Sequence, residues 1–192
     1  MFIKFYHKEL NELKEFQRAL IRVYDLYLGR DFNLEQQLIQ LLQDLLLYYK
    51  NTHTESAANW IQSLLAEIHT AKRGIHPFSL ERITIRKHEL VITTCYKIIQ
   101  NLNDRLRVDA EKLEQTLQEG RTLLKQILLG SIQLTVMTAD QIKAITTQRE
   151  RERAWSQLLT LNNGMQQLTR SLTTLVSTPD IYLLMEDLTP HF

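Results

Sequence analysis

The feature that most constrains this chain is a long apolar seam between Leu102 and Leu134. Apolar or small residues recur there at steps of three and four, which is the spacing of one face of an α-helix. The positions on this face are Leu102, Leu106, Ala110, Leu113, Leu117, Gly120, Leu124, Ile127, Ser131 and Leu134. At about 1.5 Å per residue, such a helix is about 45–50 Å long. Because a bare apolar stripe is unfavourable in water, other helices of this chain or of a partner must cover it.

Composition favours helices along the rest of the chain. Only 5 glycines and 3 prolines occur among 192 residues, so little interrupts helical structure. The net charge is +1, from 23 basic and 22 acidic residues, which excludes a global field that would attract nucleic acid or an anionic membrane. No uncharged stretch is long enough to span a membrane, and the first residues lack a signal-peptide pattern. We therefore expect a soluble, cytoplasmic protein.

Three shorter helices are predicted before the seam. The first covers residues 2–28 and ends at Gly29, which we expect to supply the left-handed residue of the helix end. The second covers residues 34–49, and the third follows Thr54 or Ser56 and ends at Gly74. The second helix closes with an apolar run, Leu45–Tyr49, which predicts a buried central helix or, alternatively, an exposed end that binds a partner.

Pro77 marks the clearest break in the chain, because proline removes a backbone donor and restricts the residue before it. We place a boundary there, between an N-terminal helical part, residues 1–77, and a C-terminal long-helix part, residues 78–192. The two parts are expected to form one continuous structural unit.

The C-terminal part is predicted to be a long antiparallel helical hairpin, packed like a coiled coil. Thr138 and Gln141 form a capping-box pattern, which places a turn just before them and starts a second helix. Apolar positions on that helix continue to Leu175. The predicted fold class is therefore all-α, a helical bundle in which a three-helix part precedes the hairpin.

Residues 82–95 are the one stretch where a strand competes with a helix. The stretch is rich in β-branched residues, which are typical of strands. However, no Gly, Asn or Asp lies between its two halves to turn a hairpin. Leu90, Thr94 and Ile98 also share one helical face, so the pattern favours a helix.

Small residues on the seam predict close packing. Ala110, Gly120 and Ser131 replace large side chains at regular points of the long helix. A glycine inside a helix costs about 1 kcal/mol relative to alanine, so the presence of Gly120 indicates that the packing there requires a small residue. Either a bulky side chain, such as Trp60 or Trp155, fills the gap, or another helix approaches closely.

The most conspicuous polar feature is the alternating run from Arg149 to Arg153, inside eight consecutive polar residues at 146–153. One interpretation is the solvated face of a continuing helix. The other is a docking surface, in which Arg149, Arg151 and Arg153 bind acidic groups on a protein partner. The intervening glutamates argue against nucleic acid, because they would repel its phosphates.

A second group of basic residues is the candidate surface for nucleic acid. Its members are Arg82, Arg86, Lys87, Arg105 and Arg107. On one helix, Arg86 and Arg105 lie about 30 Å apart, so only a bend or a partner brings the group together. Arg82 and His88 have five residues between them, which resembles the arginine-to-histidine spacing of HEPN-type helical ribonucleases. This resemblance covers two residues and implies metal-independent RNA cleavage by Arg82 and His88.

Metal and catalytic motifs are incomplete. His88 and Glu89 begin a zinc-protease pattern, but Ile92 stands where the second histidine ligand belongs. The single cysteine, Cys95, has no neighbouring motif, and we interpret it as a buried structural residue. Neither a glycine-rich phosphate loop nor a serine-nucleophile motif is present. The sequence therefore predicts no enzyme, no bound metal and no cofactor.

These observations together predict a non-catalytic helical interaction or assembly subunit, which binds protein partners in a larger complex or a homo- or hetero-oligomer. The basis is a helical surface longer than one small core requires. The alternative is a nucleic-acid-associated accessory subunit, and a HEPN-like helical ribonuclease ranks third.

Overall fold

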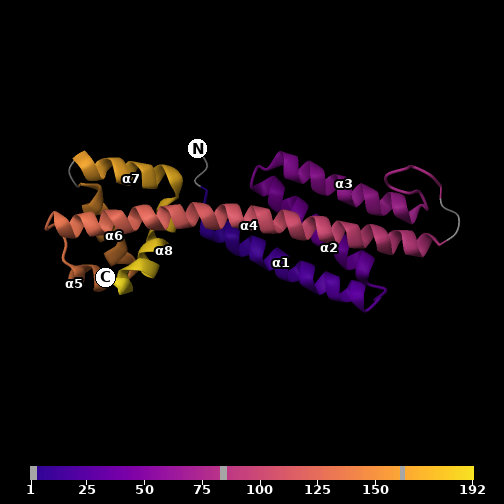
Figure 1. The fold of residues 1–192 in the computed structure, drawn as a ribbon, viewed down its shortest axis with the longest axis horizontal. Coiled ribbons are helices and arrows are strands. Elements are labelled where there is room, and N and C mark those ends of the chain that lie inside the picture. The colour runs from indigo at the N-terminus through magenta and orange to yellow at the C-terminus, as the bar shows by residue number, and fades with distance from the viewer. Residues whose placement is uncertain (1–3, 83–85, 161–162) are drawn as a thin grey trace. The chain divides into compact units, whose positions relative to one another are not determined.

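A computed structural model describes residues 4–82, 86–160 and 163–192, and these residues fold into α-helices without a β-strand (Figure 1). The helices are α1 (Tyr6–Leu28), α2 (Leu34–Asn51), α3 (Glu55–Lys72), α4 (Lys87–Gln133), α5 (Ala139–Lys143), α6 (Gln148–Leu159), α7 (Asn163–Leu175) and α8 (Thr178–Leu188), followed by a short 3-10 helix η1 (Thr189–His191). The predicted all-α class is confirmed.

The chain divides into two compact units. The first unit comprises residues 12–109, and the second comprises residues 1–11 together with 110–192. The boundary predicted at Pro77 falls inside the first unit, between α3 and α4. Helix α4 contributes residues to both units, because its seam continues through Ala110 without interruption.

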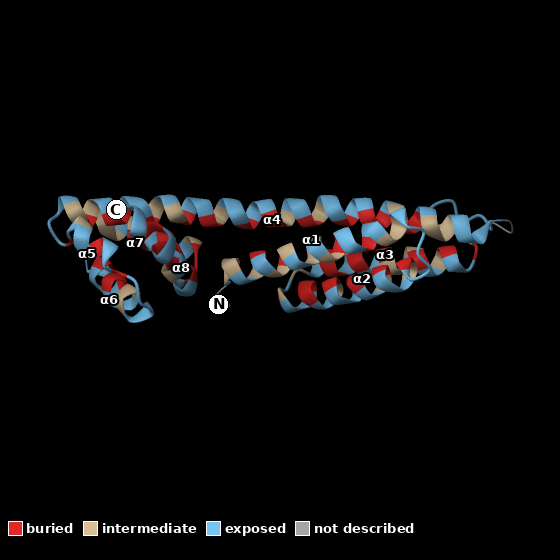
Figure 2. Ribbon diagram, turned by 90° about the horizontal axis from the view of Figure 1, so that it is seen from below, coloured by how far each residue is buried: buried red, intermediate tan, exposed pale blue. Residues whose placement is uncertain are grey.

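The first unit has a leucine- and isoleucine-rich core in which α4 packs with α1 and α3, and α2 packs with α3. Buried positions recur along one side of α4 (Figure 2), as the spacing of its seam predicts. At the end of α2, Leu45, Tyr48 and Tyr49 are buried, whereas Leu47 is exposed. The run Leu45–Tyr49 therefore belongs mainly to the core, which agrees with the first of its two interpretations.

The stretch at residues 82–95 is helical from Lys87 onward, because α4 begins there. Arg82 instead forms an isolated bridge with Ile75, and residues 83–85 lie outside the described part of the chain. The preference for a helix is thus confirmed for residues 87–95, in which Thr94 and Cys95 are buried.

The prediction of one long helix as the second arm of the hairpin is wrong, because the segment after Thr138 forms several shorter helices. The capping box of Thr138 and Gln141 is present, but the helix that it starts, α5, has only 5 residues. A second capping box lies close behind it. The hydroxyl of Thr147 accepts a hydrogen bond from the Glu150 backbone N–H at 3.3 Å, and the Glu150 carboxylate accepts from the Thr147 N–H at 2.8 Å. This box starts α6 as a separate helix.

The second unit also fixes the beginning of α1. The buried carboxylate of Asp180 accepts hydrogen bonds from the backbone N–H groups of Tyr6 and His7, at 3.1 and 2.9 Å. His7 Nδ1 lies 2.7 Å from the same carboxylate, and the Ser177 hydroxyl donates to it at 2.5 Å. One aspartate therefore satisfies free N–H groups at the starts of both α1 and α8.

Candidate functional site

One side of α1 carries large apolar side chains that the first unit does not cover. Leu20 and Val23 are buried, but their neighbours Ile21 and Leu28 are each 61% exposed, and Tyr24 is 38% exposed. Steps of three and four place Ile21, Tyr24 and Leu28 on one face of the helix. We call these three residues the α1 stripe. Large exposed apolar patches on soluble proteins mark sites of interaction.

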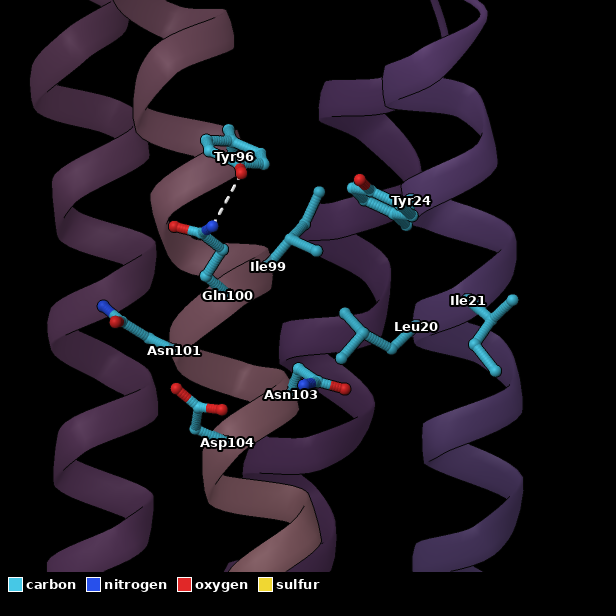
Figure 3. A pocket seen from close by; sticks show the side chains of 9 residues that line it. All are labelled: Leu20, Ile21, Tyr24, Tyr96, Ile99, Gln100, Asn101, Asn103 and Asp104. Atoms are coloured by element: carbon cyan, nitrogen blue, oxygen red, sulfur yellow. Dashed lines mark hydrogen bonds between the residues drawn. The ribbon is translucent and has the colours of Figure 1, made fainter.

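A groove of about 530 Å³ adjoins this stripe, between α1 and α4 of the first unit. Helix α1 provides an apolar wall from Leu20, Ile21 and Tyr24, and Ile99 extends from α4 toward it (Figure 3). The remaining lining residues, all from α4, are Tyr96, Gln100, Asn101, Asn103 and Asp104. The groove thus opposes one apolar wall to one wall rich in side-chain amides.

Stacked tyrosine rings form one end of this groove. The rings of Tyr24 and Tyr27 have centroids 6.0 Å apart, and those of Tyr27 and Tyr96 are 4.8 Å apart, with interplanar angles of 20° and 19°. The hydroxyl of Tyr96 accepts a hydrogen bond from Gln100 Nε2 at 2.6 Å (Figure 3). Stacking holds the rings in place, so Tyr24 presents a rigid aromatic surface that retains polar character.

The amide wall can both donate and accept hydrogen bonds, because each Asn or Gln side chain has a carbonyl and an amino group. Asp104 is the one charged side chain among the lining residues. The chemistry of the groove therefore suits a ligand with apolar side chains on one side and neutral polar groups on the other. The apolar spacing of α1 does not by itself reveal this site, because Tyr24 follows the buried Leu20 by one helical turn and so continues its face.

The three arginines of the predicted docking surface do not share one environment. Arg151 points toward α8, where its side chain is 11% exposed and its Nη1 lies 2.6 Å from Glu186 Oε2. That contact is an ion pair without hydrogen-bond geometry. Arg149 and Arg153 are exposed on α6. Only these two keep their guanidinium groups available to a partner.

The candidate nucleic-acid residues fall into two separate places within the first unit. Arg82, Arg86 and Lys87 are exposed around the start of α4, where Arg86 Nη1 lies 3.6 Å from Glu89. His88 is exposed in the first turn of that helix. Arg107 is exposed farther along α4, about 30 Å away at about 1.5 Å per residue. The structure does not bring these residues into one patch.

Arg105, the fifth member, takes part in a polar cluster that joins α2 to α4. Its Nε donates to Asp109 Oδ2 at 2.9 Å, and the Tyr49 hydroxyl donates to the same oxygen at 2.9 Å. Burial, followed by the charge of Asp109, raises the pKa of Tyr49 above its usual range, so this phenol stays protonated. The cluster satisfies buried polar groups and leaves Arg105 less available to a phosphate.

Cys95 is fully buried, as the sequence predicted. Burial, with a smaller effect from the charge of Glu35, raises the pKa of its thiol to about 12. The thiol is therefore protonated at neutral pH, whereas the thiolate is the nucleophilic form.

Within residues 4–82, 86–160 and 163–192, no group of three or more histidine, cysteine or acidic residues could hold a metal ion. No helix of this part of the chain is long and apolar enough to cross a membrane. Comparisons with known protein families, with curated proteins and with solved structures gave no match.

Proposed function

We propose that this protein is a non-catalytic helical interaction subunit, which binds an amphipathic helix of a protein partner in the groove between α1 and α4. The observation that carries the proposal is the α1 stripe, Ile21, Tyr24 and Leu28, which stays exposed beside a groove with a stacked tyrosine end. A helix that presents apolar residues at steps of three and four would cover this stripe over about two turns.

The chemistry of the groove supports a protein partner. Tyrosine is enriched at the energetic centres of protein interfaces, because it buries a large ring while its hydroxyl keeps a polar contact. Tyr24 is pre-positioned by stacking on Tyr27, so little side-chain entropy is lost on binding. The amide side chains of Gln100 and Asn103 suit the polar flank of a bound helix.

Site-specific photo-crosslinking tests the proposal. Tyr24 is replaced by the photoreactive residue p-benzoylphenylalanine, and the same residue is placed at Gln43, an exposed position of α2 outside the groove lining, as a control. We expect a discrete adduct from position 24 and none from position 43. An adduct with the same chain would identify a homo-oligomer, and an adduct with another protein would identify a heteromeric complex.

Binding is then measured with the purified partner. The double change Ile21→Asp and Leu28→Asp should weaken the complex by at least about tenfold, because it places two charges in the apolar interface. The helical circular dichroism should be unchanged, since both side chains are largely exposed. Equal crosslinking at positions 24 and 43, or undiminished affinity of the double variant, would contradict the proposal.

A further inference from the structure

A second groove lies in the second unit, where the C-terminal half of α4 meets α5, the end of α8 and η1. Its volume is about 740 Å³. This groove shares no lining residue with the groove between α1 and α4.

The ionisable side chains that line this groove are all basic. Arg121 and Lys125 line it from α4 and His191 lines it from η1, while no acidic side chain contributes to the lining. Within the part of the chain that the structure describes, neither Arg121 nor Lys125 takes part in an ion pair. The two cations are one helical turn apart, where like charges repel each other, and an anionic ligand would relieve this repulsion.

Apolar side chains continue the same line along α4. Leu129 follows Lys125 by one turn and is 44% exposed, and half-buried Ile132 comes next. Arg121, Lys125, Leu129 and Ile132 therefore form one row, with two charges at one end and apolar groups at the other. The row covers 11 residue steps, or about 16 Å, which is about three turns of helix.

We propose that this groove binds an acidic amphipathic helix of a protein partner. Carboxylates one turn apart on such a helix have the same spacing as Arg121 and Lys125, about 6 Å, so both pairs form at once. Leucine-sized side chains on the following turns then cover Leu129 and Ile132. An extended helix fits better than a small amphiphile, because the row of lining residues follows α4 for about 16 Å, which is the length of about three turns of a second helix.

The test uses a synthetic, fluorescently labelled helical peptide of about 14 residues. The peptide has Glu at positions i and i+4 and Leu at i+8 and i+11, and a second peptide has Lys in place of both Glu residues. Binding to the full chain is followed by fluorescence anisotropy. We expect saturable binding of the acidic peptide, at least about tenfold tighter than that of the Lys peptide, and weaker as salt rises.

Charge reversal locates the binding. Arg121→Glu with Lys125→Glu should weaken the acidic peptide at least about tenfold. The matched control, Lys112→Glu with Arg170→Glu, makes the same net-charge change outside the groove lining and should retain binding. The Ile21→Asp and Leu28→Asp variant should also retain it, which separates this site from the groove between α1 and α4.

Three results would overturn the inference: no saturable binding of the acidic peptide, equal binding of the Lys peptide, or an equal loss in the matched control. Dodecanoate provides a further comparison. If this fatty acid binds saturably through Arg121 and Lys125 while the peptide does not, the groove is a site for a small anionic amphiphile, and the helix proposal is refuted.

Discussion

Gly120 offers the sharpest test of how α4 packs in the second unit. A β-carbon at this position would lie 3.2 Å from Val176 Cγ1 and 3.3 Å from Leu184 Cδ1. Carbon atoms in favourable contact are about 3.5–4.0 Å apart, so even an alanine would press on both neighbours. Bulky side chains therefore fill the space beside Gly120, which agrees with the first of the two explanations, but they belong to Val176 and Leu184 and not to Trp60 or Trp155.

Gly120→Leu should destabilise the protein. Overpacking a well-filled core costs about 1–3 kcal/mol, and leucine adds three more carbons beyond the β-carbon. Replacing glycine within a helix returns up to about 1 kcal/mol. Subtracting this gain from the cost leaves a fall in the free energy of unfolding of up to about 2 kcal/mol. For a chain of this size, that change lowers the melting temperature by up to about 4–8 °C.

Thermal unfolding followed by circular dichroism measures this change. Lys112→Leu is the matched control, because it adds a leucine to an exposed position of the same helix and should alter stability by no more than about 0.5 kcal/mol. A melting temperature that is equal to or higher than that of the original chain would show that the space beside Gly120 accommodates a side chain, and would refute this account of the packing.

Three further changes test other parts of the fold. Asp180→Asn should lower the free energy of unfolding by about 1–3 kcal/mol at neutral pH, since Tyr6 and His7 lose their carboxylate acceptor. Burial tends to raise the pKa of Asp180, but hydrogen bonds from His7 and Ser177 outweigh it and lower that pKa. The stabilisation by the Asp180 carboxylate is thus fully present above pH 3.8, the usual pKa of this carboxyl, and is lost as the pH falls through the lowered pKa. The urea midpoints of the variant and the original chain should therefore converge in acid. A difference between the two midpoints that does not change with pH would contradict this. Thr147→Ala removes the N-cap of α6 and should cost about 0.5–2 kcal/mol in urea unfolding, whereas Thr146→Ala, which keeps its backbone bond to Glu150, should cost less. Arg149→Glu with Arg153→Glu should change the stability by no more than about 0.5 kcal/mol in thermal unfolding, because both side chains are exposed; a larger fall would show that they take part in packing.

Helical periodicity was enough to predict the fold class and the buried face of the longest helix. Of the ten seam positions, only Leu134 is exposed, and it lies just beyond the end of α4. This prediction succeeds because the period of the α-helix decides which residues share a side, whatever covers them. The ends of the first three helices were also close to the structure, since glycine, proline and capping residues act over a few neighbouring positions.

Local signals that compete with each other were harder to read. Thr147 and Glu150 form a capping box with the usual sequence spacing, but the polar run 146–153 that contains them matched the exposed face of a continuing helix equally well. At the end of α1, Arg30 rather than Gly29 takes the left-handed conformation, with φ of 51°. The Arg30 and Asp31 N–H groups then bond to the carbonyls of Tyr27 and Leu26. The left-handed residue thus stands one position later than expected, although α1 ends at Leu28 as predicted.

Which surfaces stay exposed depends on the packing between segments that are distant in the sequence. Ile21 and Leu28 are as apolar as the core residues beside them, and Arg151 belongs to the same charged run as Arg149 and Arg153. Their exposure depends on α4 and α8, which lie far from them in the sequence. The same holds for Asp180, which binds the start of α1 across 173 residues. Helical periodicity selects a face, but a contact between distant segments depends on how the helices pack, which no local pattern contains.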